Sequence, residues 1–347
     1  MSTSDQQPGK PIRTMAELAT AIGYSRVTVS KALNGHTDVP EATRELILQR
    51  ALELGYRPHT AARSIGKGST DMLSLVVTTQ SSTSISYTGL LRGIQRGLEP
   101  RDLLLTANEY PIDVADDENF SPRLFRELVS DGILLDTLRE LPGFAKAAER
   151  VRIPFVYLNH RRDVDAVFPD DHAGAEQATA ELIRLGHRRI AWVGNHDGTH
   201  YSVSERTAGF TAAMTAAGLK PTCYEVPIWN HSNAELLSAI EAILTSDERP
   251  TAILAYHARA AGTALFVAAR LGLRVPEDLS ILSFHGELIT QQGLSIATQR
   301  IPFDECGTQA VDLLLAKIAA NGATQQAVRV PYGATVRGDS LGPPPAP

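Results

Sequence analysis

Apolar and polar positions alternate in two different ways along the chain, and the change falls near residue 70. Residues 14–56 contain three short stretches in which apolar side chains recur every three or four positions, as in amphipathic helices. From Met72 onward, short continuous apolar stretches alternate with longer amphipathic ones. Because apolar strands that alternate with helices are typical of doubly wound parallel sheets, we expect an all-α head followed by an α/β region.

The first three stretches have the start and stop signals of short helices. Thr14 and Glu17 form a capping box for the first helix, and Ser25 can cap a second. Pro40 begins a third helix, which Gly55 ends. Two short helices joined by a tight glycine turn and braced by a third predict a helix-turn-helix domain. The side chains expected in its core are Met15, Leu18, Val29, Leu33, Leu46, Ile47, Ala51, Leu54 and Tyr56.

The second of these helices has side chains that could read DNA. In a helix-turn-helix this helix enters the major groove, and its first residues reach the base edges. Arg26 and Lys31 could donate to guanine O6 and N7, and Val27 could contact a thymine methyl group. Ser30 falls on the same face. On these residues alone, a solvated helix with no role in DNA binding is an equal alternative.

The region after residue 70 contains more strand–helix units than one sheet usually takes. We therefore expect two α/β subdomains with a cleft between them. Neither G-x-G-x-x-G nor G-x-x-x-x-G-K-[ST] occurs, so dinucleotide and P-loop binding lack their signatures. The expected strands are Leu73–Val77, Leu103–Thr106, Gly132–Leu135, Phe155–Leu158, Arg189–Val193, Thr251–Ala255 and Leu279–Phe284, with helices such as Thr88–Leu98, Ala173–Leu185 and Ala234–Leu244 between them.

Charge is distributed unevenly along the 347 residues. The whole chain carries a net charge of −6, whereas residues 1–67 carry +3, so a small basic head precedes an acidic body. No apolar run approaches the length of a membrane span, and the N-terminus lacks the hydrophobic core of a signal peptide. The two cysteines, Cys223 and Cys306, have no metal or redox spacing. We expect a cytoplasmic, nucleoid-associated protein.

No catalytic or metal-binding motif stands out. There is no G-x-S-x-G elbow and no H-E-x-x-H, and neither cysteine suits a nucleophile. The polar residues that could be taken for a metal cluster match no standard ligand spacing and are more simply explained as loop side chains; they are His196, Asp197, His200, His257 and His285. We expect no metal, no cofactor and no enzymatic activity.

The first 70 residues resemble the DNA-binding head and hinge of the LacI/GalR (lactose/galactose repressor) family of bacterial transcriptional regulators. The matching motifs are A-E-L-A, G-x-S-x-x-T-V-S-K-A-L-N, V-P-E-x-T-R, L-G-Y-R-P and A-A-R-S. The resemblance implies a disordered tail over residues 1–12, a helix-turn-helix domain over 13–56 and a hinge over 57–70. It implies DNA contacts by Thr14, Ser25, Arg26, Val27, Thr28, Ser30, Lys31, Asn34, His59, Ala62, Arg63 and Ile65.

The implied hinge has one departure from the family pattern. Residues 57–66 would become a helix when two copies meet on DNA, and the residue at position 65 would wedge into a base step of the minor groove. The family usually has leucine there, and this chain has Ile65, which keeps an apolar wedge of similar volume. The β-branched side chain leaves the bend angle open, and a packed linker residue is the alternative.

Residues 71–340 are similar to the same family's effector-binding module, a periplasmic-binding-protein-like fold. The similarity rests on stretches such as D-G-I-L-L, L-I-R-L-G-H-R-R-I-A, E-R-x-A-G-F and V-R-G-D-S. It implies three crossings between subdomains, near residues 161, 299 and 330. The N-subdomain would span about 71–161 and 300–330, the C-subdomain about 162–299 and 331–340, and residues 341–347 would form a tail.

The resemblance also implies which residues line the effector cleft. Arg206 is the strongest candidate, because a guanidinium suits vicinal hydroxyls or a carboxylate. Trp229 could stack on a sugar ring, although a core tryptophan is nearly as plausible. The full set of candidates is Asp136, Asn159, Asp171, Ser202, Arg206, Trp229, Tyr256, His257 and His285.

The cleft departs from the family at its acidic positions. The family usually has Asn-Asp where this chain has Tyr256-His257, and an acid pair where it has His285-Gly286. We expect these changes to remove negative charge and to add groups that titrate near neutrality. An acidic sugar, a modified oligosaccharide or another anion would then be the ligand. The alternative is that the histidines only rearrange hydrogen bonds around an ordinary sugar.

Together these features predict a homodimeric, sequence-specific transcriptional repressor. Two heads on a twofold axis would read a near-palindromic operator, and a small sugar-like or anionic effector would control the affinity. The C-terminus has no apolar heptads, so we expect no tetramer. Two alternatives remain: an enzyme that processes a metabolite with the cleft histidines, and an architectural DNA-binding protein that responds to no ligand.

Overall fold

The computed structural model describes residues 12–57, 68–79, 86–195, 200–226, 228, 233–291 and 293–346. The chain forms two compact units, Met1–Thr70 and Asp71–Pro347, and each is described by itself. No helix in the described ranges is long and apolar enough to cross a membrane.

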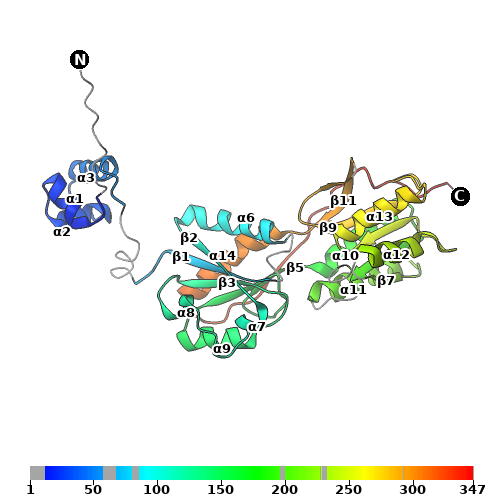
Figure 1. Cartoon of the computed structure of the whole chain (residues 1–347), viewed down its shortest axis with the longest axis horizontal. Helices are drawn as coiled ribbons and strands as arrows, with labels where there is room; N and C mark the ends of the chain where they lie inside the picture. Colours follow the sequence, from blue (N-terminus) through cyan, green and yellow to red (C-terminus); the bar gives the residue numbers. More distant parts are fainter. Residues whose placement is uncertain are drawn as a thin grey trace, which may run out of the picture. The chain divides into compact units, whose positions relative to one another are not determined.

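The first unit consists, in its described part, of three short helices (Figure 1): α1 (Met15–Ile22), α2 (Arg26–Leu33) and α3 (Glu41–Glu53). The predicted capping box is confirmed. The Thr14 hydroxyl accepts from the backbone N–H of Glu17 at 3.2 Å, and the Glu17 carboxylate accepts from the backbone N–H of Thr14 at 3.0 Å. Gly23 follows α1 with φ of 75°, a conformation that glycine adopts without strain.

Packing in the first unit corrects the predicted core at two positions. Leu18, Val29 and Ile47 are fully buried, as expected, but Leu46 and Leu54 are 43% and 38% exposed. Ile47 and Ala51 lie one helical turn apart and form the buried face of α3. Leu46 is rotated by about 100° from that face. Leu54 follows the last residue of the helix.

In the described part of the second unit, twelve strands form two six-stranded sheets. The first sheet has the order β12-β5-β4-β3-β1-β2, and the second β10-β11-β9-β8-β6-β7. Every pairing is parallel except that of β10 with β11, which confirms the predicted α/β class. The strands are β1 (Met72–Thr78), β2 (Leu104–Tyr110), β3 (Gly132–Asp136), β4 (Phe155–Leu158), β5 (Ala166–Pro169), β6 (Ile190–Asn195), β7 (Thr222–Val226), β8 (Ala252–Ala255), β9 (Ser280–His285), β10 (Ile289–Gln291), β11 (Leu294–Arg300) and β12 (Val328–Val330).

Helices cover both faces of the first sheet. Leu134 of β3 packs in the core that contains Leu90 and Val311, whereas its neighbour Ile133 packs with Phe144 on the opposite face. The helices of this region are α6 (Ser86–Leu98), α7 (Ile112–Ala115), α8 (Arg123–Arg126), α9 (Pro142–Val151) and α14 (Phe303–Ala319), with a short 3-10 turn, η1 (Glu99–Arg101). A Cβ on Gly93 of α6 would lie 2.0 Å from the Asp304 carbonyl oxygen, so glycine permits the close contact of α6 with α14.

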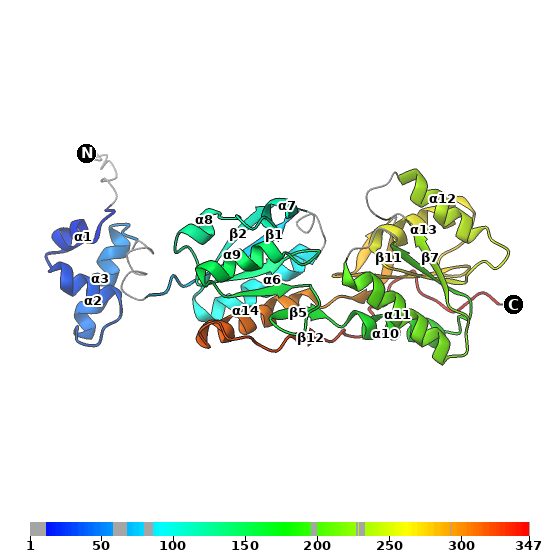
Figure 2. The ribbon, with the colours of Figure 1, turned by 90° about the horizontal axis from the view of Figure 1, so that it is seen from below.

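The second sheet is covered in the same way. Figure 2 shows α12 and α13 on one side of this sheet and α10 and α11 on the other. The bounds are α10 (Asp171–Arg184), α11 (Tyr201–Ala216), α12 (Asn233–Leu244) and α13 (Ala258–Arg270). Trp192 of β6 is fully buried and stacks on Phe210 of α11 with ring centroids 5.9 Å apart, so it anchors that helix to the sheet.

Two predicted boundaries are wrong. β5 pairs with β4 and β12, so the chain leaves the first sheet after Pro169 rather than near residue 161. The polar residues before β5 form a turn with Asp165 at φ of 52°, not a crossing. The predicted tail also begins too early, because Gly342 donates to the Ser280 hydroxyl at 3.0 Å and accepts from buried His187 at 2.9 Å.

Candidate functional site

The outer face of α2 carries the predicted base-reading side chains. Val29 and Ala32 are buried in the head, whereas Arg26 is exposed and Val27 is 65% exposed. An isolated apolar side chain with that exposure at the start of a helix is available for contact with a base. The Ser25 hydroxyl caps α2 by accepting from the Thr28 N–H at 3.0 Å, and Ser30 is half-buried.

Two predicted DNA contacts have partners within the head itself. Lys31 forms an ion pair with Asp38, and this hydrogen bond holds the pKa of the Asp38 carboxyl below its ordinary value. The Asn34 amide lies 3.5 Å from the Ser30 hydroxyl. Lys31 would have to leave Asp38 to reach a base. His59, Ala62, Arg63 and Ile65 lie outside the described residues, so the hinge contacts stay predictions.

In the second unit, a buried polar cluster surrounds Arg206 of α11. The Arg206 Nε donates to Asp171 at 2.7 Å, and the Tyr332 hydroxyl donates to the same carboxylate oxygen at 2.6 Å. The guanidinium carbon lies 4.5 Å from the centroid of the Phe284 ring. Burial disfavours the charged guanidinium, but Asp171 outweighs it and raises the pKa of Arg206. We call Asp171, His200, Ser202, Arg206, Tyr256 and Tyr332 the Arg206 cluster.

Hydrogen bonds in the Arg206 cluster run in one direction. The His200 Nε2 lies 2.7 Å from the Asn159 carbonyl oxygen and must donate to it, so Nδ1 is an acceptor. The Ser202 hydroxyl, 2.8 Å from Nδ1, therefore donates to it and accepts from the Tyr256 hydroxyl at 2.9 Å. Burial lowers the pKa of His200 to about 4, so this order of protons holds at neutral pH.

The chain of hydrogen bonds connects the two subdomains. Asn159 directly follows β4 of the first sheet, and Tyr256 directly follows β8 of the second. Asn159 has φ of 51°, in the left-handed region that a side chain rarely adopts.

Burial lowers the pKa of both histidines that we expected to titrate near neutrality. His257 caps α13 by accepting from the Arg259 N–H through Nδ1 at 3.1 Å. Burial lowers the pKa of His257 to about 3 and also lowers that of His285. Their ring centroids are 6.4 Å apart. Both rings are therefore neutral at pH 7 and add no positive charge.

Polar atoms without partners gather at the carboxyl ends of strands. Within the described residues, Asp136 Oδ2 at the end of β3, His160 Nδ1 just after β4 and Asn195 Oδ1 at the end of β6 are buried and have no hydrogen-bond partner. Burial raises the pKa of Asp136 to about 7. Buried polar atoms are rarely left unpaired, and ligands of α/β folds bind at this end of the strands.

The structure brings most of the predicted effector residues together. Asp171, Ser202, Arg206 and Tyr256 belong to the Arg206 cluster, and Asn159 joins it through its carbonyl group. Asp136 forms no hydrogen bond with these described residues, and Trp229 lies outside the described part of the chain. A metal cluster is not found among the described residues, but His196 and Asp197 fall outside them.

Sequence analysis missed Tyr332 and the role of His200. Tyr332 lies just beyond β12, far along the chain from every other member of the cluster, and no motif marked it. His200 was considered only as a metal ligand or a loop side chain. Its position two residues before Ser202 is that of a helix N-cap, a signal that could have placed it at the site.

Comparisons with known proteins match both units. Residues 14–59 match the model of the bacterial regulatory proteins of the lacI family, and residues 179–341 match that of a periplasmic binding protein-like domain. The chain is 30% identical to the regulator RafR of Escherichia coli, over 79% of this chain and 82% of that protein. It is 28% identical to the regulator CelR of Thermobifida fusca, over 91% and 94%.

Solved structures share the fold. The lac repressor dimer bound to operator and the anti-inducer ONPF matches with a TM-score of 0.75 at 18% identity, over 95% of this chain and 99% of that one. A CelR–cellobiose complex matches with a TM-score of 0.64 at 24% identity, over 94% and 99%. Taken with the helix-turn-helix, the paired parallel sheets and the sequence matches, these findings show that the chain belongs to the lacI family of bacterial transcriptional regulators.

Proposed function

We propose that the chain is a repressor that binds a near-palindromic operator as a homodimer. A neutral, sugar-like effector would raise or lower its affinity for that operator. One head offers few base contacts, so operator affinity needs two heads on a twofold axis. The exposed face of α2, with Arg26 and Val27, supports major-groove reading. The hinge over residues 57–70 and its wedge Ile65 complete this proposal.

The charges of the Arg206 cluster favour a neutral effector over an anionic one. Arg206 is paired with Asp171 at 2.7 Å, so its positive charge is already compensated. His257 and His285 are neutral, and Asp136, with a pKa of about 7, is partly ionised at neutral pH. Among the described residues of the Arg206 cluster, Arg206 is the only cation, so an anion bound at the cluster would face carboxylates and no uncompensated positive charge. Hydroxyl groups, which both donate and accept, suit the unpaired atoms of Asp136 and Asn195.

A relative that binds a sugar supports a sugar as the class of effector, but it does not identify the effector of this chain. CelR, a relative, has been solved with cellobiose. The domain order we propose is a head, a hinge and an effector module. In the effector module, residues at the carboxyl ends of the strands of both sheets would contact the ligand. The candidate contacts are Asp136, Asn159, Asp171, Ser202, Arg206, Trp229, Tyr256, His257 and His285.

Control of DNA binding would follow from linkage. An effector that favours one state of the module by 1–3 kcal/mol changes operator affinity by about 5- to 150-fold. The chain of hydrogen bonds from Tyr256 to Asn159 spans both subdomains, which supports it as part of the element that responds. Inducer and corepressor would use the same residues.

Thermal denaturation of the full-length protein with a panel of neutral and acidic sugars tests the effector class. We expect a neutral sugar to raise the melting temperature, because a ligand at a hundredfold excess over Kd stabilises the folded state by about 2.7 kcal/mol. Stabilisation by acidic sugars alone would contradict the charge argument. Stabilisation by no metabolite would instead favour an architectural protein, and turnover of the sugar would favour an enzyme.

A further inference from the structure

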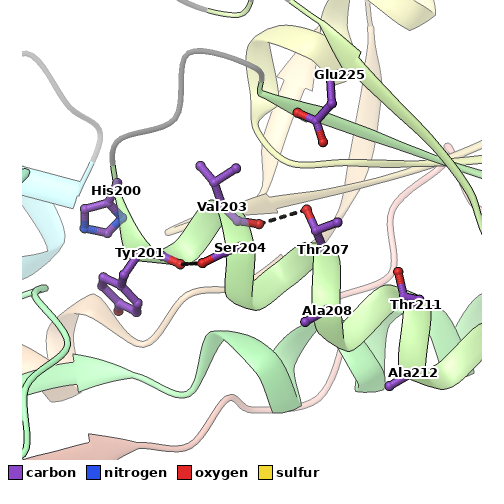
Figure 3. Close-up of a pocket in the computed structure, with 9 residues that line it drawn as sticks. All are labelled: His200, Tyr201, Val203, Ser204, Thr207, Ala208, Thr211, Ala212 and Glu225. Atoms are coloured by element: carbon purple, nitrogen blue, oxygen red, sulfur yellow. Dashed lines mark hydrogen bonds between the residues drawn. The ribbon is translucent and has the colours of Figure 1, made fainter.

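The start of α11 has two faces that contact different parts of the second unit. Ser202 and Arg206 lie one helical turn apart and belong to the Arg206 cluster. Tyr201 and Glu205, each one position earlier, are also one turn apart and share a neighbouring face of the helix. Figure 3 shows the ring of Tyr201 beside that of His200 at this end of α11, and their centroids are 4.6 Å apart.

Tyr201 packs against the subdomain of the first sheet. Its ring centroid lies 5.9 Å from that of Phe168, with the ring planes at 78°, an edge-to-face arrangement. Phe168 belongs to β5, is 5% exposed and lies in the core that also contains Phe144 and Tyr157. Because α11 covers the second sheet, Tyr201 brings an aromatic ring from one subdomain to the core of the other.

Glu205 makes the second contact between the subdomains. Its carboxylate forms an ion pair with Arg161, which lies between β4 and β5 of the first sheet. The His200 imidazole donates to the Asn159 carbonyl in the same segment, at 2.7 Å. The start of α11 therefore contacts residues 159–168 through a ring contact, an ion pair and a hydrogen bond.

These contacts fix the effector candidates of α11 relative to those of the first sheet. Ser202 and Arg206 lie on the same helical turns as Tyr201 and Glu205, so they move with them. Asp136, another candidate, lies at the end of β3 in the first sheet. When only a fraction of a protein is in the arrangement that binds a ligand, the apparent affinity falls by that fraction. Loosening α11 from the first sheet would therefore weaken effector binding.

We propose that Tyr201 and Glu205 are positioning residues for the effector response. They hold α11 against the first sheet and so set the fraction of the protein that is ready to bind the effector. The Tyr201 hydroxyl is buried and has no hydrogen-bond partner among the described residues, so the ring makes the contact. This inference rests on the proposed function, in which a sugar binds at the Arg206 cluster.

Isothermal titration calorimetry of the full-length protein with glucose, galactose, cellobiose, melibiose and raffinose tests the inference. Tyr201→Ala removes the ring, whereas Tyr201→Phe keeps it and is the matched control. Glu205→Arg and Arg161→Glu each break the ion pair, and the double variant restores it with the charges exchanged. Glu127→Arg reverses a charge in an exposed ion pair with Arg123 of α8, far along the chain from α11, and controls for charge reversal.

For every sugar that the native protein binds, Tyr201→Ala should weaken the affinity by about tenfold, because an aromatic pair between the subdomains is lost. Tyr201→Phe and Glu127→Arg should leave it unchanged. Glu205→Arg and Arg161→Glu should each weaken it by about two- to fivefold, as expected for a partly exposed ion pair. The double variant should recover the native affinity.

The melting temperature of each variant separates this role from a purely structural one. A structural role would lower the melting temperature but leave the sugar affinity of the folded variants unchanged. Far-ultraviolet circular dichroism checks folding at the temperature of the titration. If Tyr201→Ala does not fold, the charge variants at Arg161 and Glu205 still test the inference.

Unchanged affinity in Tyr201→Ala and in both single charge variants would overturn the inference and leave the proposed function intact. An equal loss in Tyr201→Phe and Tyr201→Ala would also overturn it, since the hydroxyl would then contact the sugar directly. A double variant that binds no better than Glu205→Arg would overturn the role of Glu205. Binding of no sugar by the native protein would overturn the proposed function and this inference with it.

Discussion

At the scale of single residues, the second unit depends on a few buried groups whose charges are balanced by one neighbour. Arg206 and Asp171 are 6% and 2% exposed and lie 2.7 Å apart. Removing one member of such a pair leaves the other as an uncompensated buried charge, which is far more costly than breaking a pair on the surface. The same residues are the candidate effector contacts, so stability and response are linked there.

Arg206→Ala should lower the free energy of unfolding by about 3–5 kcal/mol, because Asp171 is left buried without its cation. Urea denaturation of the full-length protein measures the loss. Arg184→Ala, which breaks an exposed pair with Glu181, is the control and should change stability by less than about 1 kcal/mol. Equal effects of the two substitutions would show that Arg206 is not buried as described.

Arg206→Ala should also abolish the response of operator binding to the effector. Unliganded operator affinity should stay near the native value at temperatures where the variant is folded, because the head is a separate unit. A fluorescence anisotropy titration with and without the stabilising sugar separates the two effects. A preserved response would contradict the placement of the effector at Arg206.

Asp136→Asn should stabilise the protein increasingly as the pH rises. The folded-state pKa of Asp136 is about 7, whereas an unfolded aspartate titrates near 3.9. Below pH 4 both states are protonated and the native residue costs nothing. Between pH 4 and 7 the unfolded state loses its proton first, so native stability falls.

The free energies of unfolding of the native protein and Asp136→Asn, measured by urea denaturation, should therefore diverge by a few kcal/mol between pH 4 and pH 7. The buried histidines His200 and His257 titrate in both proteins, so their contribution cancels in the difference. A difference that does not change with pH would mean that Asp136 is ionised at little cost.

At the scale of elements, local signals in the sequence placed the helices of the head better than the strands of the body. Thr14 and Ser25 mark the starts of α1 and α2 because caps act over three residues. β5 was not predicted because no helix separates it from β4, β12 because it is only three residues long, and β7 because its residues alternate between half-buried and exposed. Their place in a sheet depends on partners distant in sequence.

In the candidate site, too, residues in local motifs were predicted from the sequence, whereas residues brought in by the fold were not. Ser202 and Arg206 lie in the stretch S-V-S-E-R and were found by resemblance. Tyr332 reaches Asp171 only because the chain passes from β12 to the second sheet, which no local pattern encodes. The neutral state of His257 likewise follows from burial that the fold creates.

The recognition helix α2 gives the next prediction. Arg26→Ala should cost about 1–3 kcal/mol of operator affinity and relax the preference at one base position per half-site, if Arg26 contacts guanine. Arg50→Ala, an exposed arginine of α3 paired with Glu53, should change affinity little and leave sequence preference unchanged. A loss from Arg26→Ala that is uniform across sequences would make it a phosphate contact.

The C-terminal segment is an element in its own right. Truncation after Leu341 removes Gly342 and leaves His187 Nε2 and the buried Ser280 hydroxyl without their partner, at a cost of about 1–3 kcal/mol for each group. Truncation after Pro345 keeps both bonds and should leave the urea midpoint unchanged. If both truncations behave alike, the segment does not secure the second sheet.

At the scale of the whole molecule, the function we propose requires that effector binding at the Arg206 cluster changes the affinity of the head for DNA. Each unit has its own core. A coupling free energy of 1–3 kcal/mol is enough for a regulator. Both heads must act together for that coupling to appear as operator occupancy.

Selection of bound duplexes from a random DNA pool, with the purified full-length protein near physiological salt, tests the central claim most directly. The selection is run without ligand and again with each sugar that raises the melting temperature. We predict enrichment of a near-palindrome with two half-sites, and a change in its recovery between the two conditions. No enrichment in either condition, or a single half-site without its symmetric partner, would contradict a dimeric, effector-controlled reader of DNA.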